Sequence, residues 1–448
     1  MVSSGGRALP SEDRPFLGWH KNEMVFRTNE DSVGIVGPPR YGKTSGIIIP
    51  ALLTWRGPAV STSTRADVLA YVNGRREDIA DPFGGRTYVY DPFESDITYP
   101  SMHWSPLTGC ERTDVCYRRA AAMTAVSGGG VQDADHWRTG AAQILRAYFH
   151  AAALEGLPLS IVRRWLATQE VKIPAAIIRT KAGAAEIWAD DLEAMRTLGD
   201  RERGSFFQVA RGTLEATAEP KVLESCSSDD LNVREFLLTC STLFIIGPSH
   251  YQQAIAPLVA GLVDSIAQAA AEMAAEFGGR LDPPLLLALD EVANIAPLQS
   301  LPTLVSEGGG RGIITMWAVQ SLAQLRARYG ADVQDAILAA TSAKLIFGGI
   351  SNGQDLQNIS AWAGEELVDL RGRHMGEAAD AGAGGSAGGG QISVTQQYHA
   401  RLPVQDIQQL DPGNAWLFYR SRPPERVQAL PAFATPPFSS YNSAGRAR

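Results

Sequence analysis

The most informative segment of this 448-residue chain is GPPRYGKT, residues Gly37–Thr44. It fits G-x-x-x-x-G-K-[ST], the pattern of a phosphate-binding P-loop. Residues 32–36 before it predict a short buried strand. Residues 45–53 after it predict a helix, which Pro50 must end or kink early. The order strand, loop, helix indicates that the chain binds a nucleoside triphosphate. An ordinary glycine-rich turn is the alternative.

Each residue type in this loop has a chemical reason. Gly37 and Gly42 let backbone N–H groups converge on phosphate oxygens with no Cβ in the way. Lys43 reaches the β- and γ-phosphates, and Thr44 offers its hydroxyl to Mg²⁺. The following helix adds a partial positive charge at its N-terminus. The predicted nucleotide contacts are Gly37, Pro38, Pro39, Arg40, Tyr41, Gly42, Lys43, Thr44 and Ser45.

Composition indicates a soluble globular protein, with 45% hydrophobic and 20% charged residues. The formal net charge is −8, so any contact with nucleic acid must come from local basic patches. The cysteines show neither C-x-x-C nor metal-ligand spacing, and we expect reduced, buried thiols of a cytosolic protein. They are Cys110, Cys116, Cys226 and Cys240.

No targeting or membrane-spanning segment is evident. Residues 1–29 are polar and do not resemble a signal peptide. The longest apolar candidate, Ala254–Phe277, carries Asp264, Gln268 and Glu272, which favours an amphipathic helix. We therefore expect no transmembrane segment in this chain.

Strands and helices alternate on both sides of a helical region, which predicts a parallel α/β sheet interrupted by an all-α insertion. Apolar runs predict further strands at residues 243–246, 285–289, 313–317 and 344–347, while helical spacing dominates residues 101–234. The Gly- and Ala-rich stretch within residues 377–390 predicts a flexible loop. The expected organisation is an N-terminal arm (1–30), a P-loop domain (31–100 and 236–435), an inserted all-α domain (101–235) and a disordered tail (436–448).

A second motif, LLLALDE at Leu285–Glu291, has the Walker B form of an apolar strand followed by two acids. Such a strand delivers its acids to the carboxyl edge of the sheet, where ligands of open α/β sheets bind. Asp290 is predicted to hold Mg²⁺ together with Thr44, and Glu291 to accept a proton from the attacking water. A strand that ends in a solvated acidic turn is the alternative.

Two further residues are candidates for catalysis. Gln320 follows the next predicted strand and could sense the γ-phosphate or orient water; a plain strand-end polar residue is the alternative. Arg311, in a glycine-rich loop, could reach the nucleotide of a neighbouring subunit as an arginine finger, or be a surface arginine. No N-K-x-D guanine-reading motif is present.

These motifs together resemble the type IV coupling proteins, the TraG/TraD group of conjugation and type IV secretion ATPases. The resemblance covers about residues 33–433 and also includes HWRTGAA at 136–142, VQSLAQL at 319–325 and RPP at 422–424. The Walker B aspartate, Asp290, lies 246 residues after the P-loop threonine (290 − 44), which does not suit a small kinase or a GTPase. The stretch from Asp290 to Leu325 is the most specific part.

The resemblance implies a RecA-like motor domain that binds ATP and Mg²⁺ and carries an inserted all-α domain. It further implies a homo-oligomer, a hexamer when assembled, that couples ATP hydrolysis to the transfer of DNA, usually single-stranded. The implied partners are relaxase or relaxosome proteins, which the all-α domain helps to recognise, and components of the secretion channel. The implied place is the cytoplasmic face of the bacterial inner membrane.

Three departures from the family pattern stand out. Members usually begin with transmembrane helices, so either an anchor has been removed here or a partner supplies it. The second strand is followed by Ser61–Arg65 (STSTR), where the family often has charged residues after an Asp. In some members an arginine stands two residues before the position of Arg311, where this chain has Gly309, and this departure counts against the assignment of Arg311 as the arginine finger.

Two other functions are compatible with the sequence. One is a nucleotide-gated docking platform that recruits secreted proteins without pumping DNA, which the acidic net charge favours. The other is a double-stranded DNA translocase of the FtsK kind, which would need a DNA-reading winged-helix tail that the Pro-rich C-terminus does not offer.

Overall fold

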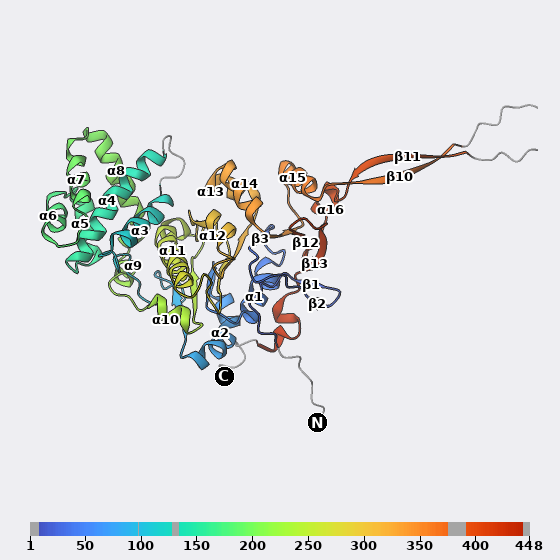
Figure 1. Ribbon diagram of the computed structural model, residues 1–448, viewed down its shortest axis with the longest axis horizontal. Helices are drawn as coiled ribbons and strands as arrows, with labels where there is room; N and C mark the ends of the chain where they lie inside the picture. Colours follow the sequence, from blue (N-terminus) through green and yellow to red (C-terminus); the bar gives the residue numbers. More distant parts are fainter. Residues whose placement is uncertain (1–8, 97, 128–133, 375–390, 442–448) are drawn as a thin grey trace, which may run out of the picture.

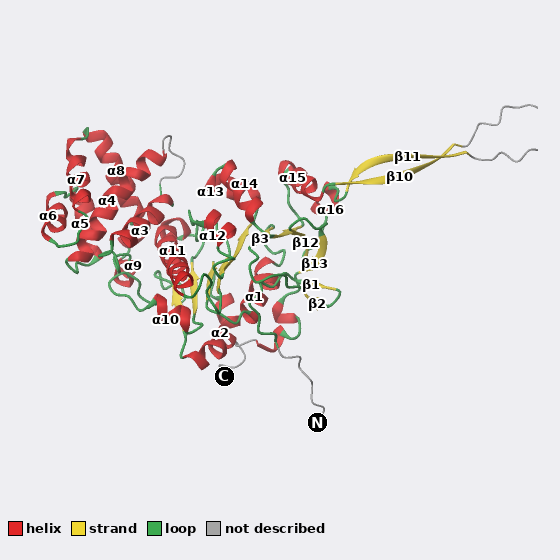
Figure 2. Cartoon of the chain, viewed as in Figure 1, coloured by secondary structure: helices red, strands yellow, loops and turns green. Residues whose placement is uncertain are grey.

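A single large sheet forms the centre of the computed structural model, which describes residues 9–96, 98–127, 134–374 and 391–441 (Figures 1 and 2). Its strand order is β2-β1-β13-β12-β9-β3-β8-β7-β4-β6-β5. The strands from β9 to β5 are parallel, and the remaining ones continue the sheet antiparallel. The parallel strands are β3 (Val33–Val36), β4 (Ala59–Ser63), β5 (Thr87–Tyr90), β6 (Thr242–Ile246), β7 (Leu285–Leu289), β8 (Ile313–Val319) and β9 (Ala343–Phe347). The antiparallel strands are β1 (Trp19–His20), β2 (Glu23–Met24), β12 (Asn414–Tyr419) and β13 (Glu425–Gln428).

Helices cover both faces of this sheet, as expected for strands that read as continuous apolar runs. In β7, Leu286 and Ala288 belong to the first core, which lies between the sheet and helices α1 and α2. Leu287 and Leu289 belong to the second core, which lies on the opposite face of the sheet. The first face is covered by α1 (Ile49–Thr54) and α2 (Asp67–Ala80). The helices of the second core that follow β6 are α11 (Gln252–Glu276), α12 (Leu301–Glu307), α13 (Leu322–Tyr329), α14 (Ala331–Ala340), α15 (Gly353–Ala363) and α16 (Val404–Gln408).

The helix after the P-loop is longer than the sequence predicts. It begins with a π-helical turn, Thr44–Ile48, and continues as α1 through Pro50 to Thr54. Pro50 stands in the first turn of α1, where a missing N–H and a fixed φ are tolerated. Of the two predicted outcomes, Pro50 does not end this helix; instead the helix changes from π- to α-helical geometry directly before the proline.

A separate helical lobe is inserted between β5 and β6, on the left in Figure 1. Gly140 allows its two long helices to pack closely, because a Cβ there would lie 2.3 Å from a ring carbon of Phe206. This contact gives a structural reason for the glycine in the HWRTGAA stretch. The helices between β5 and β6 are α3 (Thr113–Ala125), α4 (Ala134–Leu154), α5 (Leu159–Thr168), α6 (Lys172–Thr180), α7 (Glu186–Ala194), α8 (Asp200–Thr213), α9 (Pro220–Ser225) and α10 (Val233–Leu238).

Both ends of the described chain pack more closely than the sequence predicts. Strands β1 and β2 extend the sheet, and Phe16 is fully buried against Trp19 and Phe438. Phe438 lies in a 3₁₀ turn, Phe438–Tyr441, and is itself fully buried. The N-terminal segment from residue 9 onward is thus part of the P-loop domain and not a separate arm. The tail is ordered at least to Tyr441, because three aromatic rings from both ends share one cluster.

A two-stranded ribbon projects from the P-loop domain, on the right in Figure 1. It pairs β10 (Glu365–His374) with β11 (Gln391–Ala400) in antiparallel register. The predicted flexible loop at 377–390 falls outside the described residues. The sequence analysis did not predict the ribbon that flanks this loop.

Helix α11 is the one helix, within the described ranges, that has the length and apolar composition to cross a membrane. However, 67% of its most apolar window is buried inside the protein. A core helix meets the same criteria, and burial against the sheet accounts for this composition. The cysteines, all of them described, are free and buried, as the sequence predicts.

Candidate nucleotide site

Sheet order brings three strand ends together. β8 lies between the P-loop strand β3 and the Walker B strand β7, and all three are parallel. Their registers pair Val36 with Val319 and Leu289 with Trp317. The P-loop, Gln320 and the two acids therefore follow neighbouring strands at the same carboxyl edge, where open α/β sheets bind ligands.

The P-loop has the close packing that its glycines permit. Gly42 has φ +101°, a backbone conformation that favours glycine, and a Cβ at Gly37 would lie 2.5 Å from Phe347 Cβ. Lys43 Nζ donates to the carbonyls of Gly37 at 2.5 Å and Pro38 at 3.0 Å. Burial lowers the pKa of the Lys43 ammonium, and the carboxylates of Asp290 and Glu291, which follow β7, oppose that shift. The loop thus holds a cation at its centre, as a phosphate site requires.

Thr44 and Asp290, 246 residues apart, meet across the site. The Thr44 hydroxyl donates to Asp290 Oδ2 at 2.5 Å, and the backbone N–H of Glu291 donates to Asp290 Oδ1 at 3.0 Å. Thr62, at the end of β4, donates its hydroxyl to the Asp290 carbonyl at 2.8 Å. A hydroxyl and one carboxylate suit Mg²⁺, which takes oxygen ligands and completes its shell with water and substrate phosphates. Among the described residues no cluster of three or more potential ligands gathers that could hold a metal by protein atoms alone.

Glu291 is held through both of its carboxylate oxygens. Gln320 Nε2 donates to Oε1 at 3.0 Å, and Asn294 Nδ2 donates to Oε2 at 3.2 Å. Gln320 is itself held, because its backbone N–H donates to Gln324 Oε1 at 2.8 Å. Glu291 also has φ +51°, an uncommon conformation for a residue with a Cβ. The side chain predicted to act as a general base is therefore fixed in orientation at the carboxyl edge.

The sequence analysis missed Thr62, Asn294 and Gln324. Thr62 lies in the STSTR stretch noted at the second strand, so its position near a strand end was readable, although its contact was not. Asn294 lies in a turn that follows Walker B, and its backbone N–H donates to the Glu291 carbonyl at 2.9 Å. That turn folds the side chain back onto the carboxylate. An asparagine three residues after the second acid is the signal that could have found it.

Arg311 lies away from these residues. It precedes β8, whereas Gln320 follows it, and the seven residues of β8 span about 20 Å at strand geometry. Its side chain is half exposed and pairs with Glu307 at 3.1 Å. Within one chain the structure does not bring Arg311 to the other site residues, so a finger role would require a second copy.

Replacing Asp290 with asparagine is expected to raise the free energy of unfolding at pH 7 in the absence of nucleotide and Mg²⁺. Burial raises the pKa of the Asp290 carboxyl, against the Thr44 hydrogen bond and the Lys43 charge. A carboxyl whose pKa is higher in the folded protein does not lower the free energy of unfolding at pH values below its unfolded pKa of about 3.9. As pH rises from there through the folded pKa, the carboxyl lowers the free energy of unfolding progressively. Urea unfolding as a function of pH measures this.

The difference in the free energy of unfolding between Asp290→Asn and the unmodified protein should disappear as pH falls toward the unfolded pKa of the carboxyl. Asp335→Asn, at an exposed position of α14, provides the matched control and should show no such pH-dependent gap. A variant less stable than the unmodified protein at pH 7 would mean that the Thr44 and Lys43 interactions outweigh burial.

A P-loop followed by a helix, with Walker B acids and a polar strand end beside it on a mostly parallel sheet, defines a RecA-like P-loop domain, here carrying an all-α insertion. The family described as "Type IV secretory system Conjugative DNA transfer" matches residues 6–433. The chain belongs to this family, as the sequence resemblance predicts.

Curated relatives and solved structures agree with this assignment. The chain is 25% identical over 368 residues to conjugal transfer protein TraG of Escherichia coli, covering 73% of this chain and 55% of TraG. It is 22% identical to protein VirD4 of Rhizobium radiobacter, covering 88% and 56%. The chain thus spans about half the length of these relatives.

Among solved structures, unbound conjugative coupling protein TrwBΔN70 superposes with a TM-score of 0.68 at 17% identity, covering 93% of this chain and 88% of that one. TrwB in complex with ADP and Mg²⁺ gives a TM-score of 0.64 at 17% identity, with 90% and 86% covered. At this identity the likeness establishes the fold.

Proposed function

We propose that this chain is an ATP-hydrolysing coupling protein that drives DNA into a type IV secretion channel. One observation carries the proposal. Thr44 contacts Asp290 and Gln320 contacts Glu291, so the P-loop, Walker B and the intervening strand form one hydrolytic site. The family membership supports the coupling to DNA transfer, because its name describes conjugative DNA transfer.

ATP with Mg²⁺ fits the residues present, and related TrwB structures hold ADP with Mg²⁺. When bound, Mg²⁺ neutralises charge on the phosphates and helps to orient them. Thr44 and Asp290 supply the oxygen ligands for the ion. Lys43 exchanges its bonds to loop carbonyls for phosphate oxygens. Glu291 accepts the proton of the attacking water while Gln320 keeps its carboxylate oriented.

The proposed assembly follows from the family. The cargo is DNA, most simply single-stranded, presented by a relaxase or relaxosome protein and passed to components of the secretion channel at the cytoplasmic face of the inner membrane. The all-α domain is the proposed recognition domain. Arg311 lies outside the site of its own chain, which leaves a role at a neighbouring copy of a homo-oligomer, proposed as a hexamer.

A second function, a docking platform for secreted proteins that is gated by nucleotide, is favoured by the formal net charge of −8. An acidic protein gains little non-specific attraction to DNA. The two functions differ in their response to salt, because binding of a nucleic acid weakens steeply as salt rises.

Mass measurement of the full chain tests the proposed assembly. With a non-hydrolysable ATP analogue, Mg²⁺ and a single-stranded oligonucleotide, we expect a hexamer that the protein without these additions does not form. The same mixture with Lys43→Ala should fail to assemble, whereas Lys172→Ala, an exposed lysine of the all-α domain, should assemble normally. A strictly monomeric protein under every condition would favour the docking platform.

A further inference from the structure

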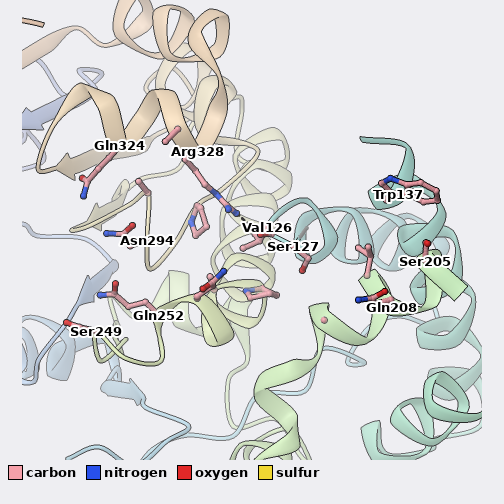
Figure 3. Close-up of a pocket in the computed structure, with 18 of the residues that line it drawn as sticks. Val126, Ser127, Trp137, Ser205, Gln208, Ser249, Gln252, Asn294, Gln324 and Arg328 are labelled. Carbon is pink, nitrogen blue, oxygen red and sulfur yellow. Dashed lines mark hydrogen bonds between the residues drawn. The ribbon is translucent and has the colours of Figure 1, made fainter. Parts of the chain in front are cut away.

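A cavity of about 950 Å³ lies between the P-loop domain and the all-α domain (Figure 3). One wall comes from α11, α13 and the turn after β7, and the other comes from α8 and the neighbouring ends of α3 and α4. Figure 3 shows Gln324, Arg328 and Asn294 on the first wall and Gln208 and Trp137 on the second. Its size is at the upper end of ligand pockets, about 300–1,000 Å³.

The cavity has a mixed polar and apolar lining and carries positive charge. Its described lining includes Arg201 and Arg328, several amides and hydroxyls, and no aspartate or glutamate. Arg328 is partly buried, and its guanidinium donates to the Val126 carbonyl at 2.9 Å, a neutral partner in the opposite domain. Burial lowers the pKa of Arg328, and the nearby charge of Arg138 acts in the same direction. A partly buried guanidinium with donors to spare calls for an anionic ligand.

The other lining residues indicate which anion fits. The amides of Gln208, Gln252 and Gln324 each offer both donors and acceptors, as the edges of nucleobases do. Trp137 supplies an aromatic ring in the wall. Aromatic rings beside cationic groups are the features by which proteins bind single-stranded nucleic acid. A ligand with acceptor groups only would match the amide N–H groups but leave the amide carbonyl oxygens without a donor.

The cavity wall is also connected to the hydrolytic site. Asn294 lines the cavity and donates to Glu291 Oε2. Gln324 lines it as well and accepts from the backbone N–H of Gln320, whose side chain holds Glu291 Oε1. Two cavity side chains therefore hold the carboxylate proposed as general base, one directly and the other through Gln320.

We infer that this interdomain cavity binds single-stranded nucleic acid, and that Asn294 transmits its occupancy to Glu291. The inference rests on the proposed function and adds the place where DNA acts. A bound strand competes for the Asn294 amide and so releases Glu291 Oε2. Released from Asn294, the Glu291 carboxylate keeps the hydrogen bond from Gln320 and is free to turn toward the attacking water. Asn294 is thus a positioning residue that restrains Glu291 until the cavity is filled.

Binding is tested with the full chain, a fluorescent single-stranded oligonucleotide and anisotropy in the presence of an ATP analogue. Arg328→Ala is expected to weaken binding by about 10-fold and to reduce the salt slope by about 0.7, the value for one phosphate contact. Gln208→Glu, an isosteric change at an exposed position of α8, should also weaken binding by several-fold. Arg164→Ala, an exposed arginine of α5 outside the cavity, is the control and should stay within about two-fold.

Transmission is tested by ATP hydrolysis. Asn294→Ala should hydrolyse ATP without DNA nearly as fast as the unmodified protein does with DNA, so that the stimulation ratio falls to within about two-fold of one. The rise without DNA should appear in kcat while the KM for ATP stays unchanged, because Asn294 contacts Glu291 and not the P-loop. A purely structural role for Asn294 would lower kcat or raise KM instead.

The outcomes separate this inference from the function on which it rests. If the unmodified protein does not hydrolyse ATP, the proposed function fails. If hydrolysis responds to DNA but Arg328→Ala and Gln208→Glu bind normally, the cavity is not the site. Full stimulation of Asn294→Ala would overturn the transmission. Binding of an acidic peptide, but not of the oligonucleotide, in an Arg328-dependent way would overturn the ligand class.

Discussion

Replacing Lys43 with alanine is expected to reduce kcat for ATP hydrolysis by about 100-fold or more. Lys43 is the buried cation at the centre of the P-loop, where its ammonium donates to two loop carbonyls. A preorganised charge that faces the transferring phosphoryl group contributes about 10²–10³ in rate when a single donor is removed. Steady-state hydrolysis at saturating Mg²⁺ and ATP measures the loss.

Two controls make the result of Lys43→Ala specific. Lys172→Ala removes an exposed lysine from the all-α domain and should keep normal hydrolysis. The circular dichroism spectrum of Lys43→Ala without nucleotide should match that of the unmodified protein, so that the loss of hydrolysis is not caused by unfolding. If Lys43→Ala hydrolyses ATP normally, the assignment of the P-loop is wrong.

Replacing Glu291 with glutamine is expected to lower kcat by about 10²–10⁴-fold, the range that general-base catalysis contributes. Glutamine has the same shape but cannot accept the proton of water. Its side chain still accepts a hydrogen bond from Gln320 or Asn294, so the local geometry should persist. Nucleotide affinity should therefore change little while turnover collapses. Single-turnover hydrolysis together with equilibrium binding of a labelled nucleotide separates the two effects.

A comparison with Gln320→Ala shows whether the loss of kcat comes from the Glu291 carboxylate itself. Gln320→Ala removes a side chain that positions Glu291 and leaves the carboxylate in place, so its loss of kcat should be smaller than that of Glu291→Gln. Equal losses in the two variants would shift the proton-accepting role away from Glu291. Normal turnover by Glu291→Gln would exclude this residue as the base.

The sequence predicted the main parts of the site because strand ends are readable from local pattern. An apolar run followed by a polar residue marks the point where a parallel strand delivers a side chain to the carboxyl edge. Asp290 and Gln320 satisfy this rule directly, whereas Thr44 was found through the P-loop pattern that follows its strand. Arg311 precedes its strand, and the same rule would place it at the opposite edge, as observed.

Other contacts were not readable because they depend on how turns fold back. Asn294 reaches Glu291 through a tight turn, and Gln324 reaches Gln320 across one turn of helix. Neither position carries a periodic signal. Strands β1 and β2, of two residues each, are too short for alternation to reveal, and Phe438 is buried by aromatic neighbours from the opposite end of the chain. Tertiary packing alone orders these segments.

The rate of ATP hydrolysis by the full chain, titrated with single-stranded DNA at saturating Mg²⁺, is the most direct test of the proposed hydrolytic site. The arrangement of Thr44, Asp290, Glu291 and Gln320 predicts Mg²⁺-dependent hydrolysis that rises several-fold and saturably with DNA, and that disappears in Glu291→Gln. Absence of hydrolysis at every DNA and Mg²⁺ concentration, or hydrolysis that persists in Glu291→Gln, would contradict it.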